Sequence, residues 1–273
     1  MNVPSEVTFR IRRFDPATHR EPVWEDYRIP YTTGMTVLDG LRKVKEMRSA
    51  TLAWRSSCRM GVCGSCGMFI NGQPCLACNT QIAHLESLPV VVAPLPNFAI
   101  VRDLVPDLRP MFDAHQALSP WIIRPDTSEM FEPTGEYMQT PEELEHFLQF
   151  TYCIKCGCCM AACPTYATDA AYSGPMPLTQ AHRYNADTRD GGFIERKAVL
   201  AGERGPWKCH YAGECSRACP KGVDPARAIQ LMKRQLVFDY LRLYKQPSPS
   251  GVLVRPVEVK RLPDVPEAPA PTI

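Results

Sequence analysis

The sequence contains no hydrophobic run long enough to cross a membrane. A spanning helix needs about 20 mainly apolar residues, and the best candidate, 88–101, is too short and is interrupted by Pro89, Pro94 and Pro96. We therefore expect any attachment to a membrane to be supplied by other subunits. Residues 1–13 also contain no apolar signal core, so we expect no secretion by the ordinary route.

The chain also lacks a strong charge of either sign. Its formal net charge is +2 at pH 7, which gives no basic footprint for a nucleic acid and says little about other partners. No nucleophile or acid–base pair suited to substrate chemistry stands out. The length of 273 residues is sufficient for two small domains. These features point away from direct chemistry on a substrate by this chain.

Cysteine, by contrast, is abundant. Eleven of the 13 cysteines fall into three spaced groups, and the spacing is typical of metal ligands rather than of a disulfide framework. Such groups indicate a reducing compartment. Several redox centres in one chain indicate a protein that conducts electrons between two partners. The groups are Cys58, Cys63, Cys66 and Cys78; Cys153, Cys156, Cys159 and Cys163; and Cys209, Cys215 and Cys219.

The first group has the spacing C-x4-C-x2-C followed by a distant fourth cysteine, which is the plant-type ligand pattern of a [2Fe–2S] centre. Gly61 and Gly64 lie among these ligands and allow the backbone to wrap closely around a small inorganic core. The run 68–70 and a turn at 71–72 predict a hairpin that returns the chain to Cys78. Four thiolates also suit zinc, so a structural zinc site is the alternative, although zinc sites usually pair two short C-x2-C hooks.

The second group is a complete C-x2-C-x2-C-x3-C run followed by Pro164. In two-cluster ferredoxins, the first three cysteines of such a run hold one cluster and the fourth binds the other. The third group is the matching run, but Ala212 occupies its second ligand position. Alanine cannot bind iron, so the two clusters receive different numbers of thiolates.

Counting ligands assigns each of these two clusters. One receives four thiolates and is predicted to be [4Fe–4S]; its ligands are Cys153, Cys156, Cys159 and Cys219. The other receives three, and a cuboidal cluster that misses one ligand tends to lose the unanchored iron. A [3Fe–4S] centre is therefore predicted there, and a [4Fe–4S] cluster with water, hydroxide or a non-cysteine fourth ligand is the alternative. Its ligands are Cys163, Cys209 and Cys215.

Two cysteines remain outside the three groups. Cys158 lies between two ligands of the second run, where binding to iron would distort the spacing, and Cys75 precedes Cys78 by three residues. We expect both to be small buried thiols.

The motifs together resemble those of the iron–sulfur subunit of the succinate dehydrogenase/fumarate reductase family, and they favour its fumarate-reductase-like branch. Centres of the 2Fe, 4Fe and 3Fe types in one chain are the signature of that family, and the ligand count reaches the same three types independently. The likeness covers roughly residues 7–244. Its motifs are CRMGVCGSC at 58–66, LAC at 76–78, CIKCG at 153–157, ACP at 162–164, AHRY at 181–184 and CPKGVDP at 219–225.

We expect an α+β protein. Strands are predicted at 7–12, 27–30 and 88–92, and a helix at 36–47 with Thr36 as its N-cap; with the resemblance, this order implies an N-terminal β-grasp plant-type ferredoxin domain. Helices at 142–150 and 225–240 flank the two later cysteine runs, in an all-α, bacterial-ferredoxin-like domain. The predicted divisions are 1–94 for the [2Fe–2S] domain, 95–140 for a proline-punctuated connector, 141–246 for the helical domain and 247–273 for a proline-rich tail.

The resemblance also implies partners and further cofactors. A flavoprotein subunit with covalent or tightly bound FAD would carry out the dicarboxylate chemistry, and one or two transmembrane anchor subunits would bind a quinone. This chain would relay electrons between the FAD and the quinone, as a peripheral protein on the cytoplasmic face of the inner (plasma) membrane. The proline-rich tail is either an arm that wraps a partner or a disordered end.

Several residues beside the predicted ligands are candidates for a further role. Arg55 and Arg59 either offset the charge of the first cluster or are ordinary surface arginines. The candidates for the quinone vicinity are Pro164, His210, Gln230 and Lys233, with a capping role for His210 and a solvated position for Lys233 as alternatives. Many ubiquinone-linked members carry a tryptophan shortly after the Cys-Pro of the third cluster, and its absence after Pro164 favours menaquinone.

Two alternatives belong to other classes of electron-transfer protein. One is the iron–sulfur subunit of another flavoprotein with a heterodisulfide-reductase-like partner; such chains often add cysteine-rich repeats, and none follows Cys219. The other is a free, soluble ferredoxin-type carrier, which is expected to be small and acidic, unlike this chain.

Overall fold

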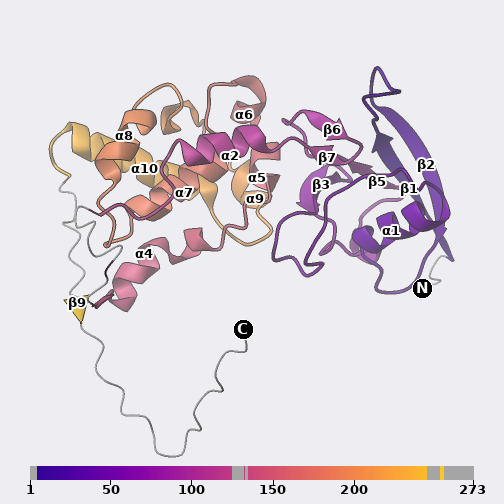
Figure 1. Ribbon diagram of the computed structural model, residues 1–273, viewed down its shortest axis with the longest axis horizontal. Coiled ribbons are helices and arrows are strands. Elements are labelled where there is room, and N and C mark those ends of the chain that lie inside the picture. Colours follow the sequence, from indigo (N-terminus) through magenta and orange to yellow (C-terminus); the bar gives the residue numbers. More distant parts are fainter. Residues whose placement is uncertain (1–4, 125–131, 133–134, 245–252, 255–273) are drawn as a thin grey trace, which may run out of the picture.

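The structure of the protein is a computed structural model that describes residues 5–124, 132, 135–244 and 253–254. Figure 1 shows a half built on a β-sheet, in indigo and purple, beside a helical half in pink to yellow. This mixed sheet and helix content agrees with the α+β prediction. Apart from 253–254, the predicted tail at 247–273 lies outside the described residues, and the predicted domain boundaries stay a prediction.

A five-stranded mixed sheet forms the first half, in the order β2-β1-β5-β3-β4. Strands β1 and β5 are parallel, and the other neighbouring pairs are antiparallel. The alternating burial of β1 puts Val7, Phe9 and Ile11 into the core, because successive side chains of a strand point to opposite faces. The strands are β1 (Glu6–Arg13), β2 (Val23–Pro30), β3 (Gly67–Ile70), β4 (Gln73–Leu76) and β5 (Val90–Ala93).

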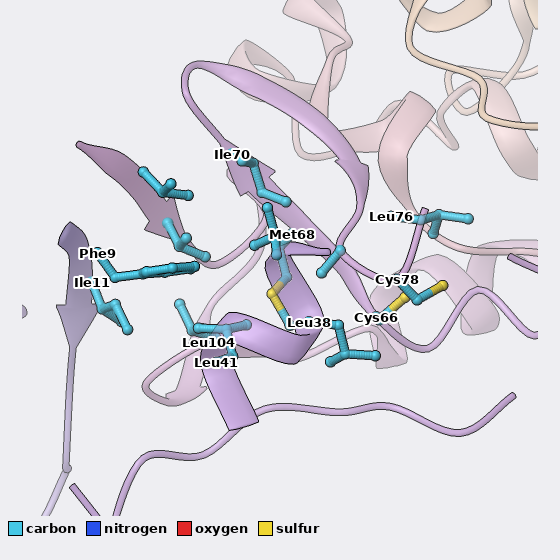
Figure 2. Packing of buried hydrophobic residues seen from close by; sticks show 14 of the residues in the cluster. Phe9, Ile11, Leu38, Leu41, Cys66, Met68, Ile70, Leu76, Cys78 and Leu104 are labelled. Carbon is cyan, nitrogen blue, oxygen red and sulfur yellow. The ribbon is translucent and has the colours of Figure 1, made fainter. Parts of the chain in front are cut away.

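Helix α1 (Val37–Met47) packs its apolar side chains against this sheet. Leu38, Leu41 and Val44 are buried in the same core as the sheet residues, and Figure 2 shows Leu38 and Leu41 below the row that runs from Phe9 to Met68. The predicted N-cap is confirmed, because the Thr36 side chain accepts a hydrogen bond from the Asp39 amide in a full capping box. Such a cap stabilises a helix by about 1 kcal/mol.

The stretch predicted as a connector contains regular structure and buried side chains. It includes β6 (Ile100–Arg102), β7 (Val105–Pro106), α2 (Arg109–Gln116) and β8 (Glu136–Tyr137), which pairs with β9 (Leu253–Val254). Leu95, Leu104, Leu108 and Met111 are buried in the core. Prolines punctuate this stretch in the sequence, but Pro110 lies in the first turn of α2, where a missing amide hydrogen costs nothing.

The second half is helical, as predicted. The helix expected at 225–240 matches α10, and that expected at 142–150 matches α4 with one residue more at each end. Among the described residues, no helix is both long enough and apolar enough to span a bilayer. The elements are α4 (Pro141–Thr151), α5 (Cys158–Ala161), α6 (Pro164–Thr168), α7 (Pro175–Asn185), α8 (Phe193–Leu200), α9 (Glu214–Arg217) and α10 (Pro225–Tyr240), with short 3-10 turns η1 (Ile82–His84) and η2 (Pro206–Lys208).

The two halves meet where the first cysteine loop contacts the second cysteine run. A Cβ atom added to Gly64 would lie 2.8 Å from the Ile154 carbonyl oxygen and 2.9 Å from the Cys156 Cβ. Nearby, the Asn97 side-chain amide donates hydrogen bonds to the carbonyls of Met160 and Ala161, at 3.0 and 2.9 Å. The loops that hold different cysteine groups are therefore in direct contact.

We expect Gly64→Ala to destabilise the protein by about 2–4 kcal/mol, because it combines a steric clash across this contact with a positive φ of 74°. Gly72→Ala is the matched control: its φ is 82°, but a Cβ there meets nothing within 4 Å, so only about 1 kcal/mol of backbone strain is expected. Thermal unfolding of both variants measures the difference. Equal losses in the two variants would show that the contact at Gly64 contributes nothing.

Candidate functional site: three groups of cysteine sulfurs

The first cysteine group lies on a loop before β3 and at the end of β4. The predicted hairpin is confirmed, since β3 and β4 pair through a turn at 71–72 and bring Cys78 back beside Cys66. Figure 2 shows the Cys66 and Cys78 sulfurs next to each other at the edge of the core. Cys66 and Cys78 are buried, whereas Cys63 is exposed. The group is therefore anchored in the core on one side and open to solvent on the other.

Backbone amides of the loop point toward its sulfurs. The Val62 and Cys63 amides lie 3.3 and 3.2 Å from the Cys58 sulfur, and the Gly61 amide lies 3.3 Å from the Cys78 sulfur. Amide donors stabilise negative charge on sulfur and are among the factors that set the potential of an iron–sulfur centre. The loop is thus folded around anionic sulfur, which fits a bound [2Fe–2S] core.

The two central thiols of this group differ in acidity. Hydrogen bonding from the Ser65 side chain, assisted by the Cys58 and Ser65 backbone, lowers the pKa of Cys63 to about 6. Burial raises the pKa of Cys66 to about 12. Only the thiolate is a nucleophile and metal ligand. In the absence of iron, Cys63 is therefore expected to react with electrophiles before Cys66 does.

In metal-free protein we therefore expect Cys63 to be alkylated by iodoacetamide before Cys66, with a rate that is half-maximal near pH 6, its pKa of about 6. Below that pH the thiol is protonated and slow, and above it the rate levels off. Mass spectrometry of the modified peptides gives both rates, and Ser65→Ala is expected to move the midpoint to higher pH. A Cys63 rate that keeps rising to alkaline pH would contradict the proposed role of Ser65.

The other seven sulfurs gather around two cavities in the helical half. One, the four-sulfur cavity, is lined by Cys153, Cys156, Cys159 and Cys219. The other, the three-sulfur cavity, is lined by Cys163, Cys209 and Cys215. The last cysteine of each run, Cys163 or Cys219, thus lines the cavity of the other run.

The two runs repeat the same backbone conformation. Lys155 and Tyr211, each two residues after the first cysteine, have φ angles of 54° and 58°, and Gly157 and Gly213 follow with 86° and 77°. Each glycine begins a four-residue helix, α5 or α9. In this alignment Ala212 occupies the place of Cys156, and it lines the three-sulfur cavity. Ala212 therefore occupies a ligand position of the repeated loop shape, and the missing ligand does not reflect a shift in register.

The spacing of the sulfurs bears on the alternative of zinc. No three His, Cys, Asp or Glu side chains in the described part of the chain are arranged to hold a single metal ion. The thiolates of a cluster are shared among several iron atoms, one on each iron in a cuboidal cluster and two on each iron in a [2Fe–2S] centre, so a cluster needs its sulfurs spread farther apart than the four ligands of one zinc ion. The donor sets and the two cavities therefore fit iron–sulfur clusters better than zinc.

Three of the four candidates for a quinone vicinity lie at the three-sulfur cavity or its ligand loop. Pro164 and His210 line it, and His210 is exposed. The Lys233 ammonium donates a hydrogen bond of 2.8 Å to the Cys209 carbonyl, so this lysine is attached to the ligand loop. The Gln230 side-chain nitrogen is buried and has no hydrogen-bond partner among the described residues.

The two cysteines outside the three groups and the two arginines beside the first group lie outside both cavities. Cys158 is fully buried, as expected, and Cys75 is partly buried and accepts a hydrogen bond from Thr80 at 3.4 Å. Neither lines a cavity described above. Arg59 is exposed, while burial lowers the pKa of Arg55.

Sequence reasoning missed three further residues that line the cavities. Tyr172 lines the three-sulfur cavity from the segment before α7, and burial, followed by the charges of Cys209 and Cys163, raises its pKa above the usual value. Lys155 and Lys221 line the four-sulfur cavity, where positive charge offsets thiolate charge. The two lysines lie beside the cysteines in sequence, so adjacency could have identified them, whereas no local signal marks Tyr172.

Two family models match the chain in this same division. Residues 8–113 match a 2Fe-2S iron-sulfur cluster binding domain, and residues 149–223 match a 4Fe-4S dicluster domain. The first match includes the Cys58 group, and the second includes all seven sulfurs of the two cavities.

Curated relatives align along most of the chain. It is 45% identical over 227 residues to the fumarate reductase iron-sulfur subunit of Mycobacterium tuberculosis, covering 83% of this chain and 91% of the relative. It is 38% identical over 242 residues to the mitochondrial succinate dehydrogenase [ubiquinone] iron-sulfur subunit of Candida glabrata, covering 87% and 94%. Among solved structures, a chain of the Mycobacterium smegmatis Sdh1 complex in the apo form aligns with a TM-score of 0.77 and 26% identity, covering 87% of this chain and 98% of that one.

Proposed function

Since the chain belongs to the family of fumarate reductase and succinate dehydrogenase iron–sulfur subunits, we propose that it relays electrons between the FAD of a flavoprotein subunit and a quinone held by one or two membrane anchor subunits. The relatives favour this role over a heterodisulfide-reductase-like subunit or a free ferredoxin. The observation that carries the proposal is the division of the sulfurs into sets of four, four and three.

The proposed ligands follow from these sets. The Cys58 loop and Cys78 hold [2Fe–2S], in a half that we assign to the β-grasp ferredoxin class. The four-sulfur cavity holds [4Fe–4S] and the three-sulfur cavity holds [3Fe–4S], in a bacterial-ferredoxin-like half. When bound, these clusters supply one-electron storage at potentials set by their type and surroundings.

The protein contributes position and electrostatics. Contact of Gly64 with Cys156 puts the first ligand loop against the second, and α5 links the two cavities, because Cys159 lies at one and Cys163 follows at the other. These contacts support an arrangement in which the proposed [4Fe–4S] site lies between the other two, as stepwise electron transfer between a flavin and a quinone requires. Amide donors at the sulfurs, and Lys155 and Lys221 at the four-sulfur cavity, offset part of the negative charge that bound clusters would bring.

The two ends of this arrangement suggest where partners bind. Met60 and Val62 on the first loop are 73% and 55% exposed, and Trp207 and Tyr211 near the three-sulfur cavity are 50% and 61% exposed. We assign the first surface to the flavoprotein and the second to the anchor and its quinone, with menaquinone as the proposed species. In the assembled complex the chain is then a peripheral subunit on the cytoplasmic face of the membrane.

The experiment is anaerobic reduction of the intact complex, purified through a tag on this chain, with succinate or with a menaquinol analogue in separate cuvettes. Either donor is expected to bleach the visible iron–sulfur absorbance of this chain. Malonate, a dicarboxylate inhibitor, is expected to block the reaction with succinate only. Failure of both donors to reduce the chain, while dithionite does, would contradict the proposed relay.

A further inference from the structure

Tyr172 has a buried position in the wall of the three-sulfur cavity. It lies in the segment between α6 and α7, its side chain is 2% exposed, and it packs in one core with Cys163, Leu178 and Ile229. It lines the cavity together with Cys163, Cys209 and Cys215. The side chain is thus held rigidly at the edge of the space that the three sulfurs share.

The hydroxyl of Tyr172 has no hydrogen-bond partner at a normal distance among the described residues, although a weaker hydrogen bond with the Cys209 side chain contributes to the raised pKa of this phenol. A buried hydroxyl without a partner costs about 1–3 kcal/mol, and a phenylalanine would fill the same volume without that cost. The other cavity offers a contrast: the Thr179 hydroxyl in its wall donates to the Pro175 carbonyl at 2.7 Å. Among the described residues that line the two cavities, only Tyr172 has a buried hydroxyl without a hydrogen bond of normal length.

The acceptors around this hydroxyl are sulfurs. Cys209, Cys163 and Cys215 all act electrostatically on the phenol, with Cys209 the strongest of the three. Two of these sulfurs also have a backbone amide nearby, from Tyr211 to Cys209 and from Tyr166 to Cys163, each at 3.4 Å. A phenol donor from Tyr172, which comes from the segment between α6 and α7, would add to these backbone contacts.

We propose that the Tyr172 hydroxyl donates a hydrogen bond to a sulfur of the centre held in this cavity, either the Cys209 thiolate or an inorganic sulfide beside it, and thereby raises the reduction potential of that centre. The inference rests on the proposed function, since it requires an iron–sulfur centre here. A donor stabilises the reduced form more than the oxidised form because reduction adds negative charge to the sulfurs. Tyr172 makes this centre a better electron acceptor.

The test is Tyr172→Phe in the intact complex, followed by a potentiometric titration monitored by electron paramagnetic resonance. We expect the equilibrium constant for one-electron reduction of the three-iron centre to fall about three- to tenfold, a shift of roughly 30–60 mV to lower potential. The potentials of the other two centres are expected to stay the same. Tyr166→Phe is the matched control, because it removes a phenol hydroxyl beside the same core but outside the cavity lining and keeps the backbone amide at Cys163.

A second measurement does not depend on the variant assembling. Electron–nuclear double resonance of the wild-type oxidised centre, in H₂O and in D₂O, is expected to show an exchangeable proton coupling beyond those of the backbone amides. An unchanged potential in Tyr172→Phe, an equal shift in Tyr166→Phe, or the absence of that proton would overturn the inference. If no three-iron signal exists in the wild type, the proposed function itself fails, and the two failures are therefore distinguishable.

Discussion

In the Ala212→Cys variant, the signal of an oxidised three-iron cluster is expected to fall at least about tenfold, with a second reduced [4Fe–4S] signal in its place. Ala212 occupies the position of Cys156 in the repeated loop and lines the three-sulfur cavity, so a thiolate there completes a four-ligand set. A tenfold preference for the four-iron form corresponds to about 1.4 kcal/mol. Electron paramagnetic resonance of air-free samples, oxidised and reduced, gives both signals.

The control for this variant is Ala212→Val, which adds volume at the same exposed position but no ligand. It is expected to keep the three-iron signal of the parent. If Ala212→Cys keeps a three-iron signal as strong as that of Ala212→Val, the side chain at position 212 does not face the three-sulfur cavity in the way that Cys156 faces the four-sulfur cavity.

Substituting the last cysteine of each run is expected to remove the cluster of the other run. Cys219→Ser should lose the [4Fe–4S] signal and keep the three-iron signal, because Cys219 lines the cavity of Cys153, Cys156 and Cys159. Cys163→Ser should do the reverse, because Cys163 lines the cavity of Cys209 and Cys215. Iron content and resonance signals of the two purified complexes measure the loss.

The [2Fe–2S] signal serves as the internal control in both variants, since its ligands lie in the other half of the chain. If each substitution instead removed the cluster nearest in sequence, the crossed ligand sets would be wrong. The effect is expected to be large because loss of a metal ligand is among the most damaging single changes.

The sequence predicted those features whose cause is local. The spacing of cysteines within a run reflects the shape of one loop, so the ligand sets and the gap at Ala212 could be inferred before any fold was known. Thr36 and its capping box depend on residues three apart, and α10 begins at Pro225, directly after its Asp224 cap. Local chemistry alone decides these elements.

Features that depend on distant contacts were not predictable in the same way. The prolines of 95–140 led to its prediction as a connector, yet one of them, Pro110, lies in the first turn of α2. Arg196 and Asp190 form a buried ion pair, 2.7 Å apart. The Arg196 guanidinium also donates hydrogen bonds to the carbonyls of Ser119 and Trp121 and so connects α8 to that segment. Nothing in the local sequence indicates this ion pair. The role proposed for the Tyr172 hydroxyl likewise could not be predicted from the sequence, because it depends on the fold that brings Tyr172 to the cavity of Cys163, Cys209 and Cys215.

The most direct measurement is a quantitative redox titration of the intact complex by low-temperature electron paramagnetic resonance, with spins counted for each signal. The account predicts one centre of each type per chain: a three-iron signal in the oxidised sample, and [2Fe–2S] and [4Fe–4S] signals on stepwise reduction. Absence of the three-iron signal together with a second [4Fe–4S] centre would contradict the assignment of the cavity lined by Cys163, Cys209 and Cys215. The proposed delivery of electrons to a quinone at that end of the chain would then lose its support.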